Sequence, residues 1–412
     1  MLRNYFKTAI AVLKRRKFFT FISLFGISFT LTLLILIASL VDSVLSVGYP
    51  DFNRSRELFV NHLQLTSTKN GSNISSGPSF YFFEHYVSGL KTQEKLAVFS
   101  NNKHTTSYTN NKKLVFNLKY TDDRFWEVLQ FQFVEGKPYT KQQLDNGETL
   151  AIISEDARDN YFGKQMNVVG KYIETDNIQY RVAGVVRGAP RFGDVYADIY
   201  VPYTLSKANI HNTGISGDYT GILLLHKASD IPAMKVEFDQ MVSKIPAENI
   251  VFDIIKITAD TYFENFARNI TDEHNGDTGV TRVFLSFTLF LLLFLLLPTL
   301  NLININISRI MDRYSEIGVR KAFGASAGTL VYQFVVENLI LTLMGGVLGI
   351  LFSFILLQVV NYIRPFANVE LTLSFNVFFF SVFVCLLFGL ISGVYPAWRM
   401  SKMQVVTALK SQ

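Results

Sequence analysis

Four long apolar runs constrain this chain more than any other feature of its sequence. The first, Phe18–Val41, carries no charge and is long enough to cross about 30 Å of hydrocarbon as a helix. Three more runs follow at residues 283–307, 330–360 and 375–394. The first run could also be a secretory signal peptide, but the apolar region of a signal spans only about 7–15 residues. We therefore predict four transmembrane helices, the first of them uncleaved.

Residues 42–282 form a long segment without any run of membrane length. Its alternating apolar patterns predict strands, its 3.6-residue patterns predict helices, and Lys69–Pro78 is predicted to be a loop rich in Gly, Ser and Asn. The predicted strands are Glu57–Leu65, Leu114–Tyr120, Thr149–Ser154, Gln179–Val186, Gly221–His226 and Asn249–Ile257, and the predicted helices are Ser79–Leu90 and Ile231–Ile245. We expect an α+β domain, with residues of about 119–215 as a possible inserted lobe. The fold class is thus an α+β membrane protein, with this domain between the first and second spans.

The single cysteine, Cys385, lies inside the fourth apolar run, so the domain outside the membrane has no disulfides. Lys and Arg concentrate in three places: before the first span, between the second and third spans, and in the tail at 395–412. The loop at 361–374 carries only Arg364. The positive-inside rule therefore puts both termini in the cytoplasm and residues 42–282 on the other side. Residues 1–17 are expected to form a basic amphipathic helix on the cytoplasmic membrane surface.

Residues 308–329 are a short polar stretch between two spans. Ile310, Tyr314 and Ile317 recur at helical spacing, and Glu316 and Arg320 are placed for an i,i+4 ion pair. Gly324 is expected to end the helix. Such an amphipathic helix lies on the membrane surface or docks on a cytoplasmic partner, although a plain connecting loop remains the alternative. The residues that we single out in this stretch are Arg309, Arg313, Tyr314, Glu316, Ile317, Arg320 and Lys321.

Small residues in the apolar runs point to close contacts between helices. Gly345 and Gly349 form one GxxxG step around Gly346, and Gly389 and Gly393 form a second. This spacing lets helix backbones approach each other, within one chain or across a dimer interface. We therefore predict that these five glycines lie in helix packing or dimer contacts.

Polar residues and prolines also interrupt the apolar runs. Gln333, Glu337 and Asn338 come early in the third run, and an acidic side chain there is a functional candidate by default. A solvated or Arg-paired Glu337 near the membrane surface is the alternative. Pro298 is expected to kink the second span and Pro396 to end the fourth.

The usual signatures of catalysis are missing. The chain contains no GxxxxGK[ST] segment, and its six histidines show no metal-ligand spacing. The adjacent acids at 122–123 and 155–156 are neighbours in sequence, so their side chains diverge and make a poor catalytic pair. We predict no catalytic, cofactor or metal site in this chain, and therefore no enzyme.

Several linked motifs resemble the permeases of the MacB/FtsX/LolC type of ABC transporter. Residues 313–326, RYSEIGVRKAFGAS, are similar to the hallmark cytoplasmic segment of that family, and Gln333 and Glu337 followed by GGVLG at 345–349 continue it. The tail resembles the family's C-terminal signature through residues 395–397 and 407–410. The external segment resembles the MacB-like periplasmic core at residues 121–126, 135–137, 147–154 and 180–186.

The resemblance implies a mechanism in which ATP hydrolysis moves periplasmic domains, called mechanotransmission. It implies a cytoplasmic ABC ATPase that holds ATP and Mg²⁺, a second permease chain as an identical or related copy, membrane lipid around the spans, and a periplasmic adaptor with an outer-membrane factor. MacB carries its ATPase ahead of the first span, whereas this sequence starts near that span, so we expect the ATPase in a separate chain. No nucleic-acid partner is expected. The location implied is the inner membrane, with a periplasmic domain.

Within this reading, the sequence leaves open efflux of drugs or peptides, lipoprotein release and control of an envelope enzyme. A membrane-anchored binding or sensor protein that regulates an envelope partner is the main alternative, and an enzyme is the third. The alternatives differ in whether residues 308–329 contact an ATPase.

Overall fold

The computed structural model describes residues 15, 17–109, 111–191, 193–206, 213–246, 252–272, 277–312, 314–324, 326–363 and 368–401. The helix predicted within residues 1–17 and the tail after Ser401 lie almost entirely outside this set. The chain divides into two compact units. The helical unit contains residues 1–44, 285–365 and 370–412, and the soluble unit contains residues 45–284 and 366–369. Each unit is described by itself below.

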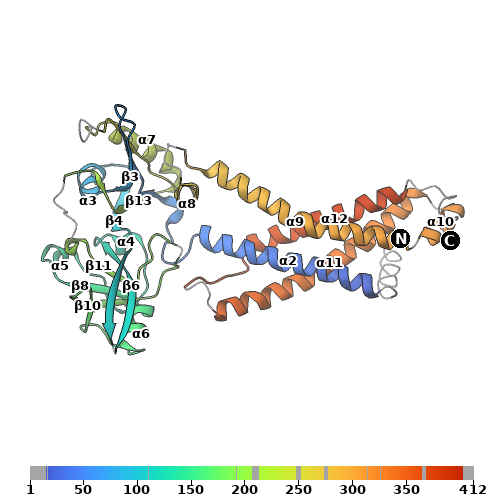
Figure 1. The fold of residues 1–412 in the computed structure, drawn as a ribbon, viewed down its shortest axis with the longest axis horizontal. Helices are drawn as coiled ribbons and strands as arrows, with labels where there is room; N and C mark the ends of the chain where they lie inside the picture. Colours follow the sequence, from blue (N-terminus) through green and yellow to red (C-terminus); the bar gives the residue numbers. More distant parts are fainter. Residues whose placement is uncertain are drawn as a thin grey trace. The chain divides into compact units, whose positions relative to one another are not determined.

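The helical unit confirms the prediction of four spans. Among the described residues, four helices are long and apolar enough to cross a membrane. They are α2 (Lys17–Leu45), α9 (Val280–Met311), α11 (Ala327–Ile363) and α12 (Phe375–Ser401) (Figure 1). Between α9 and α11 lies the short helix α10 (Tyr314–Ala322). Because α9 continues to Met311, Ile310 belongs to α9 and does not share a helix with Ile317, contrary to the predicted stripe. The backbone is also helical through Pro298.

The prediction that Pro396 ends the fourth span is wrong, because α12 continues through it to Ser401. A proline inside a helix removes the N–H that would bond the carbonyl four residues earlier, here the carbonyl of Ser392. That oxygen instead accepts a hydrogen bond of 3.0 Å from Nδ2 of Asn306 on α9. Proline is tolerated in a spanning helix when a neighbouring helix satisfies the freed backbone group in this way.

The soluble unit is built on a ten-stranded mixed sheet with the order β1-β13-β4-β6-β11-β8-β10-β7, to which β5 and β9 add at β6 and β10. A four-stranded sheet has the order β12-β3-β2-β14. The strands are β1 (Glu57–Val60), β2 (Leu63–Thr66), β3 (Asn73–Pro78), β4 (Gln93–Ser100), β5 (Lys103–Thr109), β6 (Lys112–Thr121), β7 (Phe133–Gly136), β8 (Leu150–Ser154), β9 (Tyr172–Thr175), β10 (Ile178–Val186), β11 (Ile199–Pro202), β12 (Ser216–Gly217), β13 (Tyr219–Leu225) and β14 (Ile254–Ile257).

Helical segments connect these strands and cover the sheets (Figure 1). They are η1 (Arg54–Arg56), α3 (Phe80–Phe82), the π-helical turn η2 (Phe83–Val87), α4 (Phe125–Val128), α5 (Lys141–Asp145), α6 (Glu155–Phe162), η3 (Tyr203–Leu205), η4 (Ala228–Asp230), α7 (Ile231–Val242) and α8 (Tyr262–Thr271). The α+β class predicted for this segment is confirmed.

Both faces of the large sheet are covered, which explains the apolar runs in its strands. On β13, Leu223 and Leu225 point into one hydrophobic core, and Ile222 and Leu224 point into another. The strands β4 and β8 alternate between these cores in the same way, as the two-residue period of a strand requires. We call them the first core, with Leu223, and the second core, with Ile222.

The predicted boundaries differ from the structure in several places. Residues 69–78 were expected to form a loop, but Asn73–Pro78 forms β3. Ser79–Leu90 is a short α-helical turn followed by a π-helical turn, and Glu57–Leu65 is two strands. Strands from 119–215 and from its flanking segments share the ten-stranded sheet, so hydrogen-bonded strands continue across the predicted lobe boundary.

Candidate functional site

The short helix α10 is attached to the spanning helices by an apolar anchor. Ile317 is buried, and it belongs to a cluster with Leu330 and Phe334 of α11 and Ala397 of α12. Among the α10 residues whose side chains the structure describes, Ile317 and Gly318 are the buried ones. An apolar contact of this kind holds a short helix that would not be stable in isolation.

A second attachment of α10 is polar. Nη1 of Arg320 donates a hydrogen bond of 3.1 Å to Oε1 of Gln333 on α11, and Nε2 of Gln333 donates one of 3.2 Å to Oε1 of Glu337. Gln333 and Glu337 are both buried. The structure thus brings together three residues that the sequence had placed in two separate sets, and it connects α10 to the interior of α11.

Deeper in the helical unit, two asparagines connect three helices. Nδ2 of Asn306 on α9 donates to Oδ1 of Asn338 on α11 at 3.1 Å and to the Ser392 carbonyl on α12 at 3.0 Å. Nδ2 of Asn338 donates in turn to the Gly389 carbonyl on α12 at 2.5 Å. We call this group the asparagine node. The sequence had marked Asn338 as intramembrane and polar, but it gave no partner for it.

The glycines of the two GxxxG steps lie at helix contacts within this chain. A Cβ atom built on Gly345 or Gly349 would lie 2.7 Å from Ile27 Cγ2 or 2.9 Å from Leu31 Cβ of α2, respectively. The α12 glycines are equally close to α11. A Cβ on Gly389 would lie 2.5 Å from Thr342, and one on Gly393 would lie 2.5 Å from Nδ2 of Asn338.

Gly346 is different, since its Cβ would meet only Cys385 Sγ at 3.9 Å, which is an ordinary contact. Four of the five predicted glycines therefore permit close approach between helices of one chain.

The outer surface of α10 carries an apolar pair that the sequence reasoning did not single out. Val319 is 45% exposed and Phe323, just after the helix, is 89% exposed. Their i,i+4 spacing was a readable signal of a second apolar face. The side chains of Arg309, Arg313, Tyr314, Glu316 and Lys321 lie outside what the structure describes.

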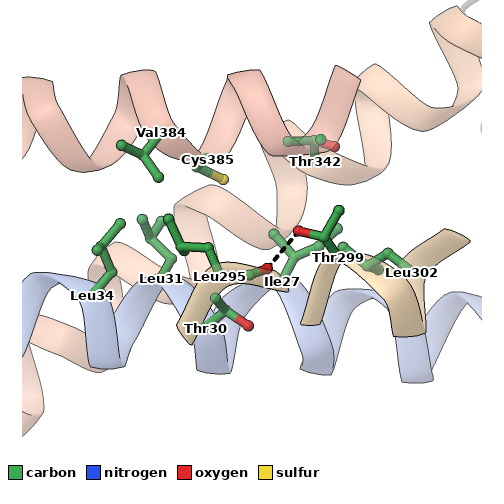
Figure 2. Close-up of a pocket in the computed structure, with 11 residues that line it drawn as sticks. Ile27, Thr30, Leu31, Leu34, Leu295, Thr299, Leu302, Thr342, Val384 and Cys385 are labelled. Carbon is green, nitrogen blue, oxygen red and sulfur yellow. Dashed lines mark hydrogen bonds between the residues drawn. The ribbon is translucent and has the colours of Figure 1, made fainter. Parts of the chain in front are cut away.

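A small cavity lies among the spanning helices (Figure 2). Its volume is about 40 Å³, and its lining is almost wholly apolar, with Leu31 and Leu34 of α2, Leu295 of α9 and Cys385 of α12 among the residues around it. The hydroxyl of Thr299 donates a hydrogen bond to the Leu295 carbonyl, which the dashed line marks. This hydroxyl therefore needs no hydrogen-bond acceptor inside the cavity. Ligand pockets usually measure about 300–1,000 Å³, so we interpret this space as a packing cavity.

Burial raises the pKa values of two acidic residues of the soluble unit. Asp122 is buried, accepts from the Phe125 backbone N–H at 2.8 Å and pairs with Arg124 at 3.1 Å, and its burial raises its pKa to about 7. Burial and the neighbouring Asp51 raise the pKa of Glu57 to about 10. Within the described part of the chain, no group of three His, Cys, Asp or Glu side chains is arranged to hold a metal ion.

Comparison with known proteins places these features in a family. Residues 20–241 match the model of the MacB-like periplasmic core domain, and residues 288–405 match that of the FtsX-like permease C-terminal region. The pyoverdine export ATP-binding/permease protein PvdT of Pseudomonas fluorescens is 27% identical over 293 residues, which cover 71% of this chain and 42% of PvdT. The chain thus spans less than half the length of this relative.

The uncharacterized ABC transporter permease YknZ of Bacillus subtilis is 24% identical over 346 residues, which cover 82% of this chain and 81% of YknZ. A solved domain of a putative permease protein from Porphyromonas gingivalis superposes with a TM-score of 0.41 at 12% identity, covering 52% of this chain and 92% of that domain.

The four membrane-length helices and the matched periplasmic domain fit an inner-membrane protein with a large periplasmic domain. Together, the two family matches show that this chain belongs to the family of ABC transporter permeases that combine a MacB-like periplasmic core domain with an FtsX-like permease region.

Proposed function

We propose that this permease converts ATP hydrolysis by a cytoplasmic ABC ATPase in a partner chain into movement of its periplasmic domain. The observation that carries the proposal is the double attachment of α10, through Ile317 and through the Arg320–Gln333–Glu337 series. A helix held in this way transmits force to α11 and α12 as a rigid body. In the proposed topology, both termini and α10 lie in the cytoplasm.

The docking surface for the ATPase is the exposed face of α10. Val319 and Phe323 offer an apolar anchor that the described part of the chain leaves exposed. Exposed aromatic side chains are frequent anchors of protein interfaces. Arg309, Arg313, Tyr314, Glu316 and Lys321 complete the proposed coupling site with Ile317 and Arg320.

Efflux of drugs or peptides is the transport reaction that we favour, because the relative PvdT is named for pyoverdine export. Lipoprotein release is the second possibility. A second permease chain, identical or related, and a periplasmic adaptor with an outer-membrane factor belong to the same proposal. ATP and Mg²⁺ would be held by the ATPase.

The experiment separates docking from transmission. The tagged permease is purified from native membranes in mild detergent, and the proteins that accompany it are identified by mass spectrometry. We expect a P-loop ATPase with the wild-type chain and its loss from the double variant Val319→Ser, Phe323→Ser, because the apolar anchor is gone. Arg320→Ala should retain the ATPase but lose transport-coupled hydrolysis, because the bond to Gln333 is broken.

Tyr108→Ser is the matched control, since Tyr108 is also exposed, at 72%, but lies on β5 of the soluble unit. It should retain both the ATPase and its coupling. If the double variant still retains the ATPase, the exposed face of α10 is not the docking surface. Recovery of an envelope protein with no ATPase in any sample would favour a membrane-anchored sensor.

A further inference from the structure

The soluble unit contains a polar cavity of about 700 Å³ that the coupling mechanism does not use. Its volume lies within the range of pockets for drug-sized ligands, about 300–1,000 Å³. Helix α8 supplies one wall with Tyr262, Asn265, Phe266, Asn269 and Ile270, which recur at spacings of three and four and so share one helical face. The other walls come from β3, from Lys119 on β6, from Thr220 on β13, and from loop residues that include Asn61, His62, Asn101, Asn102, Arg191 and Asp194. We call it the Lys119 cavity.

Lys119 occupies a position where the sheet elsewhere places an apolar side chain. Leu118 and Tyr120 point into the first core, so Lys119 points to the face of the second core. Its register partner on β11 is Tyr200, which belongs to the second core. A lysine that is only 2% exposed at such a position costs stability unless a partner compensates its charge.

The compensation for this ammonium group within the domain is incomplete. Nζ donates one hydrogen bond of 2.9 Å to the Ser100 carbonyl and lies 4.9 Å from the centre of the Phe99 ring. An ammonium group has three donors. Among the described residues, no carboxylate lies within ion-pair distance of Nζ. Burial lowers the pKa of Lys119 to about 7, and the charge of Asp194 offsets only part of that effect.

A hydrogen-bond acceptor in the same cavity also lacks a donor. Nδ2 of Asn61 donates to Oδ1 of Asn265 at 2.8 Å, and Nδ2 of Asn265 donates to Oδ2 of Asp194 at 2.8 Å, so both amide groups have a fixed orientation. Oδ1 of Asn61 is buried and accepts no hydrogen bond from the described residues. The cavity therefore presents an unsatisfied cationic donor and an unsatisfied amide acceptor.

The remaining walls define the chemistry of a matching ligand. Arg191 adds a second cation, and Asp194 and Asp218 add two acids at exposed positions. Five side-chain amides also line the cavity, and they are Asn61, Asn101, Asn102, Asn265 and Asn269. A ligand that complements these groups carries a carboxylate, N–H donors and amide groups in one small molecule.

We propose that the Lys119 cavity binds a short peptide, with a carboxylate at Lys119 and N–H groups at Asn61 and the rim acids. A carbohydrate would supply hydroxyl groups for the amides but no charge for Lys119, and a simple anion would leave the acids and Asn61 unused. The inference rests on the soluble unit alone. It therefore stands or falls independently of the ATPase docking proposed above.

The test uses the full-length chain in lipid nanodiscs and two mass-encoded tripeptide libraries, one with free carboxylates and one with C-terminal amides. After equilibrium dialysis, we expect the wild-type chain to retain peptides from the free-acid library. Lys119→Met should weaken that retention about tenfold to a hundredfold, because a charge-assisted hydrogen bond is lost. The amidated library should bind the wild-type chain as weakly as the free acids bind the variant.

Thermal unfolding supplies a second readout, because replacing a lysine that stabilises the fold would lower the melting temperature. Below pH 7 the buried ammonium is charged in both the folded and the unfolded chain, so its desolvation cost is fully present. Lys119→Met should therefore raise the melting temperature at pH 6 while weakening peptide retention. Lys113→Met, at an exposed position of the same strand, should change neither.

Three results would overturn the proposal. They are no peptide retained by the wild-type chain, equal retention of free-acid peptides by Lys119→Met, and equal retention of amidated and free-acid peptides by the wild-type chain. If Lys119→Met does not fold, Arg191→Gln at the exposed rim serves instead and should weaken retention severalfold. Unchanged retention in that variant would count against a carboxylate site.

Discussion

The two units of this chain bury polar side chains in different ways. In the soluble unit, the buried Arg268 pairs with Asp260 at 2.8 Å, with both side chains under 5% exposed, and Arg158 pairs with Glu135 at 3.3 Å. In the helical unit, the asparagine node satisfies backbone carbonyls with neutral amides. Charged pairs need many hydrogen-bond partners, which a sheet with loops supplies. Helices in hydrocarbon have few such groups, so amides take this role.

Lys119 is the exception that the comparison exposes. It is a buried cation of the soluble unit that contacts one carbonyl and one aromatic ring, and the charge of Asp194 offsets only part of its burial. Its departure from the pattern of Arg268 and Arg158 is what marks its cavity as a ligand site.

The two tryptophans allow each unit to be followed separately. Trp126 lies in the second core of the soluble unit, and Trp398 lies on α12 of the helical unit. Replacing one of them with Phe leaves fluorescence that reports on the other unit.

The largest expected effect is in the soluble unit. Arg268→Ala should lower its free energy of unfolding by about 3–5 kcal/mol, because Asp260 would remain as a buried charge without its partner. Trp126 fluorescence during chemical unfolding, in a Trp398→Phe background, measures this loss. The double variant Arg268→Met, Asp260→Asn should recover much of it. A loss below 1 kcal/mol in the single variant would show that the pair is solvated.

A smaller effect is expected at the close contact between α2 and α11. Gly349→Ala should cost about 1–3 kcal/mol, since its Cβ would lie 2.9 Å from Leu31 Cβ and 3.0 Å from the Ser28 carbonyl. Gly346→Ala is the matched control and should be neutral, because its nearest neighbour is 3.9 Å away. Trp398 fluorescence during denaturation in SDS, in a Trp126→Phe background, compares the two. Equal effects would place Gly349 outside the contact with α2.

The smallest effect is expected at the asparagine node. Asn306→Leu should cost about 0.6–2 kcal/mol, the range of hydrogen bonds between helices in membranes. Pro396→Ala restores the N–H that bonds the Ser392 carbonyl. The cost of Asn306→Leu should therefore be smaller in the Pro396→Ala background, and the same SDS titration measures this double-mutant cycle. Identical costs in both backgrounds would contradict the role of Asn306 at Pro396.

The sequence predicted the spans and several buried strands, among them β8 and β13, because both kinds of element are continuous apolar patterns. It missed the buried strands β4 and β11. It also failed at β3, because Asn73–Pro78 contains two Ser, one Gly and one Pro, and its first three residues are exposed. Helix α8 was also missed, although the capping box formed by Thr261 and Glu264 marks its start.

The candidate sites depended more strongly on tertiary structure. GxxxG spacing indicated close approach, but nothing in the sequence named Ile27 and Leu31 as the neighbours. The continuation of α12 through Pro396 depends on a hydrogen bond from Asn306 of α9 to the Ser392 carbonyl. Asn306 lies far from Pro396 in the sequence, so no local pattern predicts this bond. Lys119 lay inside a predicted strand, but only the pairing of β6 with β11 places it beside Tyr200.

The central claim, that α10 is the contact for an ATPase, can be tested most directly by cross-linking. Cys385 is the only cysteine in the sequence, so a Cys385→Ser background accepts a single reporter at Phe323→Cys, which is highly exposed. A bifunctional cysteine-reactive photo-cross-linker is applied in native membranes, with Tyr108→Cys in the soluble unit as the control. The account predicts an adduct between Phe323→Cys and a P-loop ATPase, and none from Tyr108→Cys. Adducts with an ATPase from Tyr108→Cys alone, or from neither position, would contradict it.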